Sequence, residues 1–157
     1  MIMIPTASDE ERNYNAGDII CHENERPDGL FIVKEGLVEI FHQLATDEGV
    51  AEVSLGRIGA RGMFGEMGII DHQPRSASAR ALGPTRVVFI SRLAFQKHLE
   101  DLPPWVSILI KTFVQRVRES NRRLVEVVEA ADQGRLKIGN HEIIISHGDE
   151  DEEDKKF

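Results

Sequence analysis

Cysteine is almost absent from this 157-residue sequence, which holds only Cys21. A lone thiol excludes an intramolecular disulfide and cannot supply the set of thiolates that an iron–sulfur cluster needs. Apolar runs near the roughly 18 residues of a membrane-spanning helix are also missing. The N-terminus has no basic start and turns acidic after Ser8, so we expect no secretory signal. These absences predict a cytoplasmic protein without a membrane span.

An excess of basic residues is missing as well. The formal net charge is −8 and the pI is near 5.2, which disfavours a nucleic-acid-binding protein. The six histidines show no His-x-His pair in the part of the chain rich in short apolar runs, as a metal-dependent β-barrel enzyme would need. No nucleophile and base stand at a recognisable spacing. We therefore expect no metal and no enzymatic activity, with the barrel enzyme as a rejected alternative.

Short β-prone runs punctuated by glycine fill the chain from Gly17 to about Ile90. Such runs with turn residues between them predict an antiparallel barrel or sandwich. Residues 45–49 are typical of a hairpin loop in which Gly49 takes a positive φ. The predicted strands lie within 18–22, 29–34, 36–44, 50–56 and 86–91.

Helical patterns follow. Ser91 is a good N-cap for a helix over 92–102, which Pro103 and Pro104 end. Apolar residues at helical spacing then predict a long amphipathic helix over 104–131, ending before Gly134. Such a helix either folds back over the β domain or pairs with a copy of itself; the second option predicts a homodimer.

The remaining residues, 132–157, form a C-terminal extension. Gly139-Asn140 suggests a small hairpin within 135–147. Residues 149–157 hold six acids against two lysines, and we expect this tail to be disordered.

The stretch GEMGIIDHQPRSA, residues 65–77, combines types of residue that suit a phosphorylated sugar. The glycines beside Glu66 would let a ligand approach the backbone at the start of a very short helix. Glu66 would repel a phosphate, so it makes better sense as an acceptor for neutral ribose hydroxyls. Arg75 offers a rigid fork of donors to phosphate oxygens, and Ser76 adds a hydroxyl. Glu66 and Arg75 could instead be ordinary surface residues.

The longer stretch FGEMGIIDHQPRSASARA resembles the phosphate-binding cassette of cyclic nucleotide-binding domains, as in catabolite activator proteins, protein kinase A regulatory subunits and cyclic-nucleotide-gated channels. Residues 16–41, AGDIICHENERPDGLFIVKEGLVEIF, resemble the opening strands of that family. The resemblance implies a mainly β fold, an eight-stranded β-roll with a short cassette helix and two C-terminal helices, the last one long. It implies a domain over 15–131, with the roll over 15–91 and the helices over 92–131, after a short segment 1–14.

The resemblance also implies a ligand and its contacts. Arg75 and Ser76 would hold the cyclic phosphate, Glu66 would accept the ribose 2′-hydroxyl, and the long helix would close over the base as a movable lid. cAMP is favoured over cGMP. The expected binding set is Gly65, Glu66, Met67, Gly68, Arg75, Ser76 and Ala77, with possible base contacts from Arg116, Asn121, Arg122 and Arg123.

No helix-turn-helix pattern follows the long helix, so the chain resembles a stand-alone bacterial sensor module, or a fragment of a larger protein, without a DNA-binding domain. We expect it to act on an unidentified protein partner. The alternative is a cyclic-nucleotide-binding fold that has lost its ligand and serves as an interaction or dimerisation module.

Overall fold

The structure is a computed structural model that describes residues 10–46, 49–132, 135–138 and 141–144. Two compact units, residues 1–121 and 122–157, are described separately. The expected disordered tail, 149–157, and the turn at Gly139-Asn140 lie outside the described residues.

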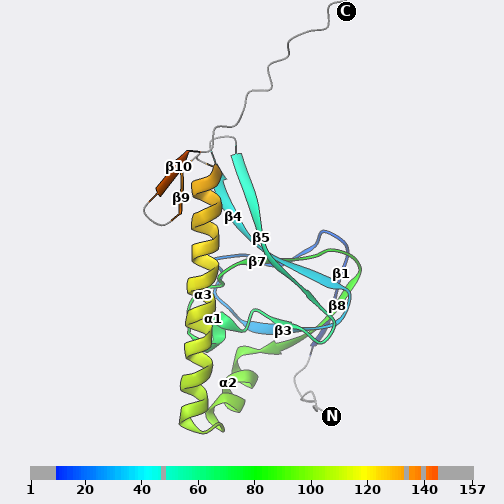
Figure 1. The fold of residues 1–157 in the computed structure, drawn as a ribbon. Coiled ribbons are helices and arrows are strands. Elements are labelled where there is room, and N and C mark those ends of the chain that lie inside the picture. Colours follow the sequence, from blue (N-terminus) through cyan, green and yellow to red (C-terminus); the bar gives the residue numbers. More distant parts are fainter. Residues whose placement is uncertain (1–9, 47–48, 133–134, 139–140, 145–157) are drawn as a thin grey trace, which may run out of the picture. The chain divides into compact units, whose positions relative to one another are not determined.

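Eight strands of the first unit form two four-stranded antiparallel sheets, as predicted (Figure 1). One sheet has the order β1-β8-β3-β6, with β1 (Glu10–Tyr14), β3 (Gly29–Glu35), β6 (Met63–Phe64) and β8 (Thr85–Ser91). The other has the order β2-β7-β4-β5, with β2 (Ile19–Cys21), β4 (Leu37–Thr46), β5 (Gly49–Gly59) and β7 (Ser78–Ala81). Strand β1 lies within the expected segment 1–14 and pairs with β8.

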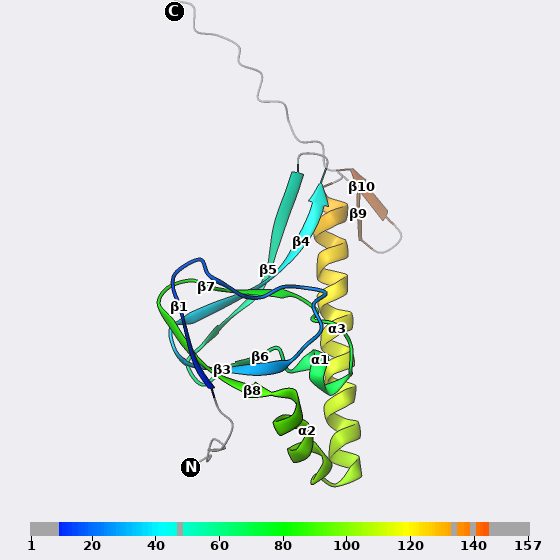
Figure 2. The ribbon, with the colours of Figure 1, turned by 180° about the vertical axis from the view of Figure 1, so that it is seen from behind.

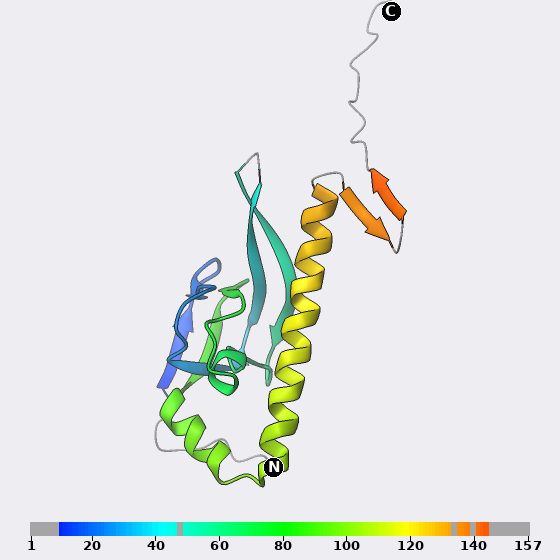
Figure 3. The same ribbon diagram turned by 90° about the vertical axis from the view of Figure 1, so that its left-hand side faces the viewer.

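The strands β4 and β5 form one long hairpin, and their pairing continues to Thr46, past the stretch of β4 that pairs with β7 (Figure 3). Thr46 faces Gly49, which has the predicted positive φ of +135°. The predicted hairpin loop is thereby confirmed at its two ends.

Alternation along β3 and β8 explains how the first sheet buries both faces. Phe31 and Val33 point into the roll, where Phe31 stacks on Phe64 with ring centroids 5.0 Å apart. Leu30 and Ile90 point the other way, and form a second apolar cluster with the two short helices. The continuous apolar runs of these strands therefore reflect a sheet covered on both sides.

Three helices belong to this architecture, and Figure 2 shows α1 beside α3 from the opposite side to Figure 1. They are α1 (Met67–Ile70), α2 (Arg92–Glu100) and α3 (Pro104–Asp132). The Ser91 hydroxyl caps α2 by accepting a hydrogen bond from the Ala94 amide at 3.3 Å, as predicted. The long helix is also confirmed. In the second unit, β9 (Arg135–Ile138) and β10 (His141–Ile144) pair as the expected hairpin.

Candidate nucleotide-binding site

The chain between β6 and β7 builds the candidate site. It leaves β6 at Phe64, makes one turn of helix in α1, and returns through Pro74 and Arg75 to β7. The two strands belong to opposite sheets of the roll. The loop therefore crosses between the sheets and closes one end of the space between them.

A cavity of about 130 Å³ lies under this loop. Apolar side chains of the two sheets make much of its wall, among them Ile40, Ile58 and Phe64. All seven residues of the expected binding set line it, and α3 contributes Asn121. The volume is below the roughly 300–1,000 Å³ of common small-molecule pockets. A whole nucleotide must therefore use the open side of the cavity or displace a wall.

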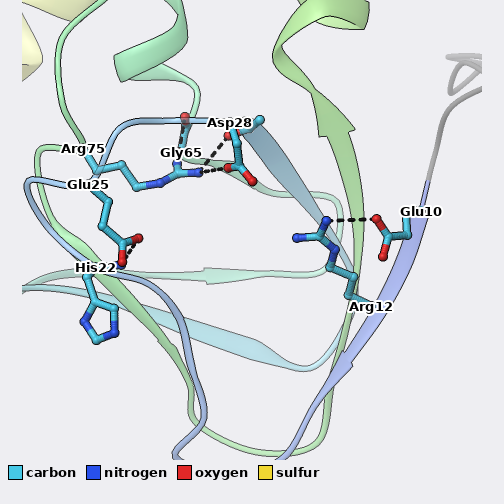
Figure 4. Close-up of polar contacts among 8 residues, drawn as sticks. Glu10, Arg12, His22, Glu25, Asp28, Gly65 and Arg75 are labelled. Carbon is cyan, nitrogen blue, oxygen red and sulfur yellow. Dashed lines mark hydrogen bonds and ion pairs between the residues drawn. The ribbon is translucent and has the colours of Figure 1, made fainter.

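Arg75 is the buried cation of this cavity, with 5% of its surface exposed. Its Nη2 donates to Asp28 Oδ1 and to the Gly29 carbonyl, both at 3.0 Å, and its Nη1 donates to the Gly65 carbonyl at 3.3 Å (Figure 4). A guanidinium has five N–H groups. Two of them, at Nε and Nη1, have no acceptor among the described residues, so Arg75 is held in place with donors left for an anion.

The loop before β3 fixes the backbone of Arg75. The Arg75 amide donates to the Glu25 carbonyl at 2.9 Å, and the Asn24 amide donates to the Arg75 carbonyl at 3.0 Å. Asp28 ends the same loop. Sequence reasoning missed this support, because the partners lie about fifty positions from Arg75 and no local pattern links them.

The two glycines of the motif are required by the protein's own packing. Gly65 has a φ of +78°, and a Cβ there would lie 2.5 Å from Arg75 Nη1. A Cβ on Gly68 would lie 2.6 Å from the Gln73 carbonyl oxygen. In the structure these glycines leave room for the returning loop, so the Gly-x-x-Gly spacing and the arginine ten positions after Gly65 are parts of one packed unit. Approach of a ligand to their backbone stays a prediction, and both glycines line the cavity.

Glu66 precedes α1 and its side chain does not cap the helix. Burial raises the pKa of Glu66. A hydrogen bond from its own backbone amide and the charges of Arg118 and Arg75 oppose this rise only in part. A half-buried carboxylate with no hydrogen-bonded partner among the described side chains is suited to accept a hydrogen bond from a neutral hydroxyl. This environment agrees with the expected role at a ribose.

Ser76 and Cys21 complete the polar and sulfur groups of the wall. The Ser76 hydroxyl lies 3.7 Å from the Met67 sulfur, a weak acceptor that a phosphate oxygen could replace. Burial raises the pKa of the Cys21 thiol, which is therefore a neutral part of the apolar wall.

The four polar residues proposed to contact the base differ in whether they line the cavity. Asn121 lines the cavity, whereas Arg116 is exposed and is not part of its lining. Arg122 and Arg123 belong to the second unit, and Arg122 pairs with Glu126 at 3.7 Å. Any contact of these three arginines with a base stays a prediction.

Arg118 is a further residue that the sequence did not single out. Its Nε donates to Asp71 Oδ2, and its Nη2 donates to Asp71 Oδ1 at 3.0 Å and to the Pro74 carbonyl at 3.1 Å. Asp71 is the C-cap of α1, and Pro74 directly precedes Arg75. The first unit's part of α3 is thus bonded to both ends of the segment that leads to Arg75.

A larger cavity of about 430 Å³ lies against the other end of α1, where Ile69 and Ile70 meet residues of α2 and α3. Its charged groups, Glu100 and Lys111, are exposed. Compared with this larger cavity, the smaller one joins the buried cation Arg75 to the half-buried carboxylate of Glu66, so it is the better candidate of the two for a phosphorylated ligand.

The described residues contain no group of three or more His, Cys, Asp or Glu side chains placed to hold a metal ion. None of their helices is long and apolar enough to cross a membrane.

These features define the class of fold: a two-sheet β-roll in which the loop between β6 and β7 carries a buried arginine and lines a cavity. Comparison with known proteins identifies the family to which this fold belongs. The profile of the cyclic nucleotide-binding domain matches residues 11–101, and this chain belongs to that family. The resemblance inferred from residues 64–81 and 16–41 is confirmed.

Two curated relatives illustrate the family. The chain is 30% identical over 111 residues to a cAMP-dependent protein kinase type II regulatory subunit of Drosophila melanogaster, covering 65% of this chain and 28% of that protein. It is 28% identical over 124 residues to a CRP-like cAMP-activated global transcriptional regulator of Mycobacterium tuberculosis, covering 79% and 54%. The chain therefore spans about half or less of these relatives.

Among solved structures, the EAL enzyme Bd1971 in its cAMP-bound form is similar with a TM-score of 0.65 and 27% identity, covering 79% of this chain and 32% of that one. The cGMP-bound form of the same enzyme gives a TM-score of 0.64 at 27% identity and the same coverage.

Proposed function

We propose that this chain is a regulatory module that binds a cyclic nucleotide, cAMP in preference to cGMP, in the cavity beneath the loop 65–77. Arg75 carries the proposal. It is buried, it is held by Asp28 and two carbonyl oxygens, and it keeps two N–H groups for an anion. A buried arginine with unused donors is suited to a phosphate.

The other groups of the cavity fit the rest of such a ligand. Glu66 would accept the ribose 2′-hydroxyl, Ser76 would donate to a phosphate oxygen, and Asn121 would face the purine. Asparagine can pair with the N6 and N7 edge of adenine. The names of two relatives and the structural neighbour support cAMP as the ligand, and the cGMP-bound form of that neighbour makes cGMP the necessary comparison.

Calorimetric titration of the nucleotide-stripped protein with cAMP and, separately, cGMP tests this function. We expect binding at micromolar concentrations or below, tighter for cAMP. Tighter cGMP binding would overturn the base preference and keep the site. Absence of heat with both ligands, from a folded sample, would favour a module that has lost its ligand and acts through protein contacts.

A specific observation supports protein contacts in any case. Apolar side chains at four-residue intervals along α3 stand in solvent: Trp105, Leu109, Phe113 and Val117 are 66%, 43%, 53% and 46% exposed. The exposed apolar face of α3 carries these side chains, whereas Val114 is buried. We propose that this face pairs with the same face of a second copy, since like faces of long helices commonly pack together. A cytoplasmic location and an unidentified protein partner stay predictions.

A further inference from the structure

We infer that Arg118 is a positioning residue of the nucleotide site, through which α3 and the cassette loop 71–76 influence each other. This inference rests on the proposed function and adds to it a regulatory contact. The contact, here called the Arg118 clamp, consists of the Arg118 guanidinium, the Asp71 carboxylate and the Pro74 carbonyl.

The geometry of the clamp is unlike that of an ordinary surface ion pair. Two nitrogens of Arg118 bond the two oxygens of Asp71, and Nη2 also reaches the Pro74 carbonyl at 3.1 Å. The side chains of Arg118 and Asp71 are 24% and 10% exposed. Paired hydrogen bonds between charged groups fix direction as well as distance, and shielding from water strengthens them.

The clamp sits where a small movement would reach the ligand. Asp71 ends α1, and its Oδ1 also accepts from the Gln73 amide at 3.1 Å, so the carboxylate organises the turn 71–74. The Pro74 carbonyl is one peptide bond from Arg75. Displacing Arg118 therefore releases the turn that places Arg75 and Ser76.

The same movement would change the size of the cavity. Asn121 stands three residues after Arg118, on the same side of α3, and lines the cavity. The cavity of about 130 Å³ is small for a whole nucleotide. A ligand that shifts the wall at Asn121 must act on α3 next to the clamp, and a change in α3 must act on the turn before Arg75.

Variants that remove either side of the clamp provide the test. We expect Arg118→Gln and Asp71→Asn each to weaken cAMP binding about tenfold. The double variant should bind no more weakly than either single variant, because both changes break the same contact. Arg118→Lys keeps the positive charge without the paired N–H groups, so its affinity for cAMP should lie between those of the unchanged protein and Arg118→Gln. Lys111→Gln removes another cation from α3 and should bind cAMP like the unchanged protein.

Amide hydrogen exchange supplies a readout that loss of stability alone would not give. In the unchanged protein and in Lys111→Gln, cAMP should alter exchange over residues 105–121. In Arg118→Gln and Asp71→Asn, cAMP should alter exchange in the cassette but no longer in α3. Unchanged affinity, tighter binding, additive losses in the double variant, or a retained response of α3 would each overturn the inference.

Failure of the proposed function gives a distinct result. If neither cAMP nor cGMP binds the unchanged protein, hydrogen exchange of the nucleotide-free proteins still tests whether the Arg118 clamp couples α3 to the cassette loop. Faster exchange over 71–76 and 105–121 in both Arg118→Gln and Asp71→Asn, relative to Lys111→Gln, would support the coupling of the two segments. Equal exchange in all of them would overturn it.

Discussion

Replacing Arg75 by alanine should weaken cAMP binding far more than replacing Arg80 by alanine. Arg80 is the matched control because it lies on β7, five residues after Arg75. Its neighbour Ala79 lines the cavity, whereas Arg80 does not. Successive residues of a strand point to opposite faces. Both variants lose an arginine from the segment at or just before β7, but only Arg75→Ala loses it from the cavity.

The structure sets the magnitude. Three N–H groups of Arg75 bond the protein, and two are left for a phosphate. A hydrogen bond to a charged group is worth about 1.5–3 kcal/mol. Two such bonds make about 3 kcal/mol or more, so Arg75→Ala should raise the Kd for cAMP by roughly 100-fold or more.

Arg80→Ala should affect stability instead. Arg80 bonds Glu39, a carboxylate with only 7% of its surface exposed, through Nε at 2.9 Å, and pairs with Glu52 at 2.7 Å. The hydrogen bond from Arg80 is the main reason that the pKa of Glu39 lies below its usual range. Removing Arg80 leaves that carboxylate with Ser54 as its bonded side chain. We expect unfolding to become easier by about 1–3 kcal/mol, with cAMP affinity unchanged.

Calorimetric titration at a temperature where circular dichroism shows both variants folded separates the two effects. Arg75→Lys keeps a positive charge and should lose about tenfold, which guards against a misfolded alanine variant. Equal loss of affinity in Arg75→Ala and Arg80→Ala would refute the assignment of Arg75 to the phosphate.

Three further outcomes are expected. Affinity for cAMP should fall as the pH drops through the raised pKa of Glu66, because the protonated acid is a weaker acceptor for the ribose hydroxyl. The same protonation favours the folded state, since the pKa is higher there than in the unfolded chain. Glu66→Gln should therefore flatten the pH dependence of the Kd measured by calorimetry. Gly65→Ala should raise the Kd for cAMP at least tenfold and lower Tm, since the new Cβ strains a φ of +78° and meets Arg75; an unchanged Kd would contradict this. Phe113→Lys should convert the proposed homodimer to a monomer in light scattering, and a monomeric unchanged protein would dispose of the dimer.

The strongest sequence signals were local and periodic. Apolar runs in β3 and β8, the cap at Ser91 and the stripe of α3 follow from patterns within about ten residues. Strand β1 gave no such signal, because EERNY is an edge strand that mixes charged and half-buried residues. Strand β6 has only two residues.

The candidate site shows the same division. Glu66, Arg75 and Ser76 could be predicted because they share one short motif. Asp28, Gly29 and Arg118 could not, since only the fold brings them to that motif. Helical spacing could have predicted part of this. Val114, Arg118 and Asn121 are spaced by four and three residues, so the face that buries Val114 also carries Arg118 and Asn121. Choosing positions on α3 by polarity alone placed Asn121 together with the exposed Arg116.

The bond between Asp28 and Arg75 sets a limit on which phosphates the cavity can accept. Arg75 lines the cavity together with the carboxylate of Glu66, and it is already paired at 3.0 Å with Asp28, whose side chain is exposed outside the cavity lining. A cyclic phosphodiester brings one negative charge, whereas a terminal phosphate brings about −1.5 to −2 near pH 7. Of the described residues that line the cavity, Arg75 is the one cation and Glu66 the one carboxylate, so no second lining cation offsets the second charge. Hydrolysis of the cyclic phosphate should thus weaken binding through charge alone. Titration with 5′-AMP should show little or no binding. If cAMP is the ligand, hydrolysis of its cyclic phosphate would then weaken its binding without any change in its base.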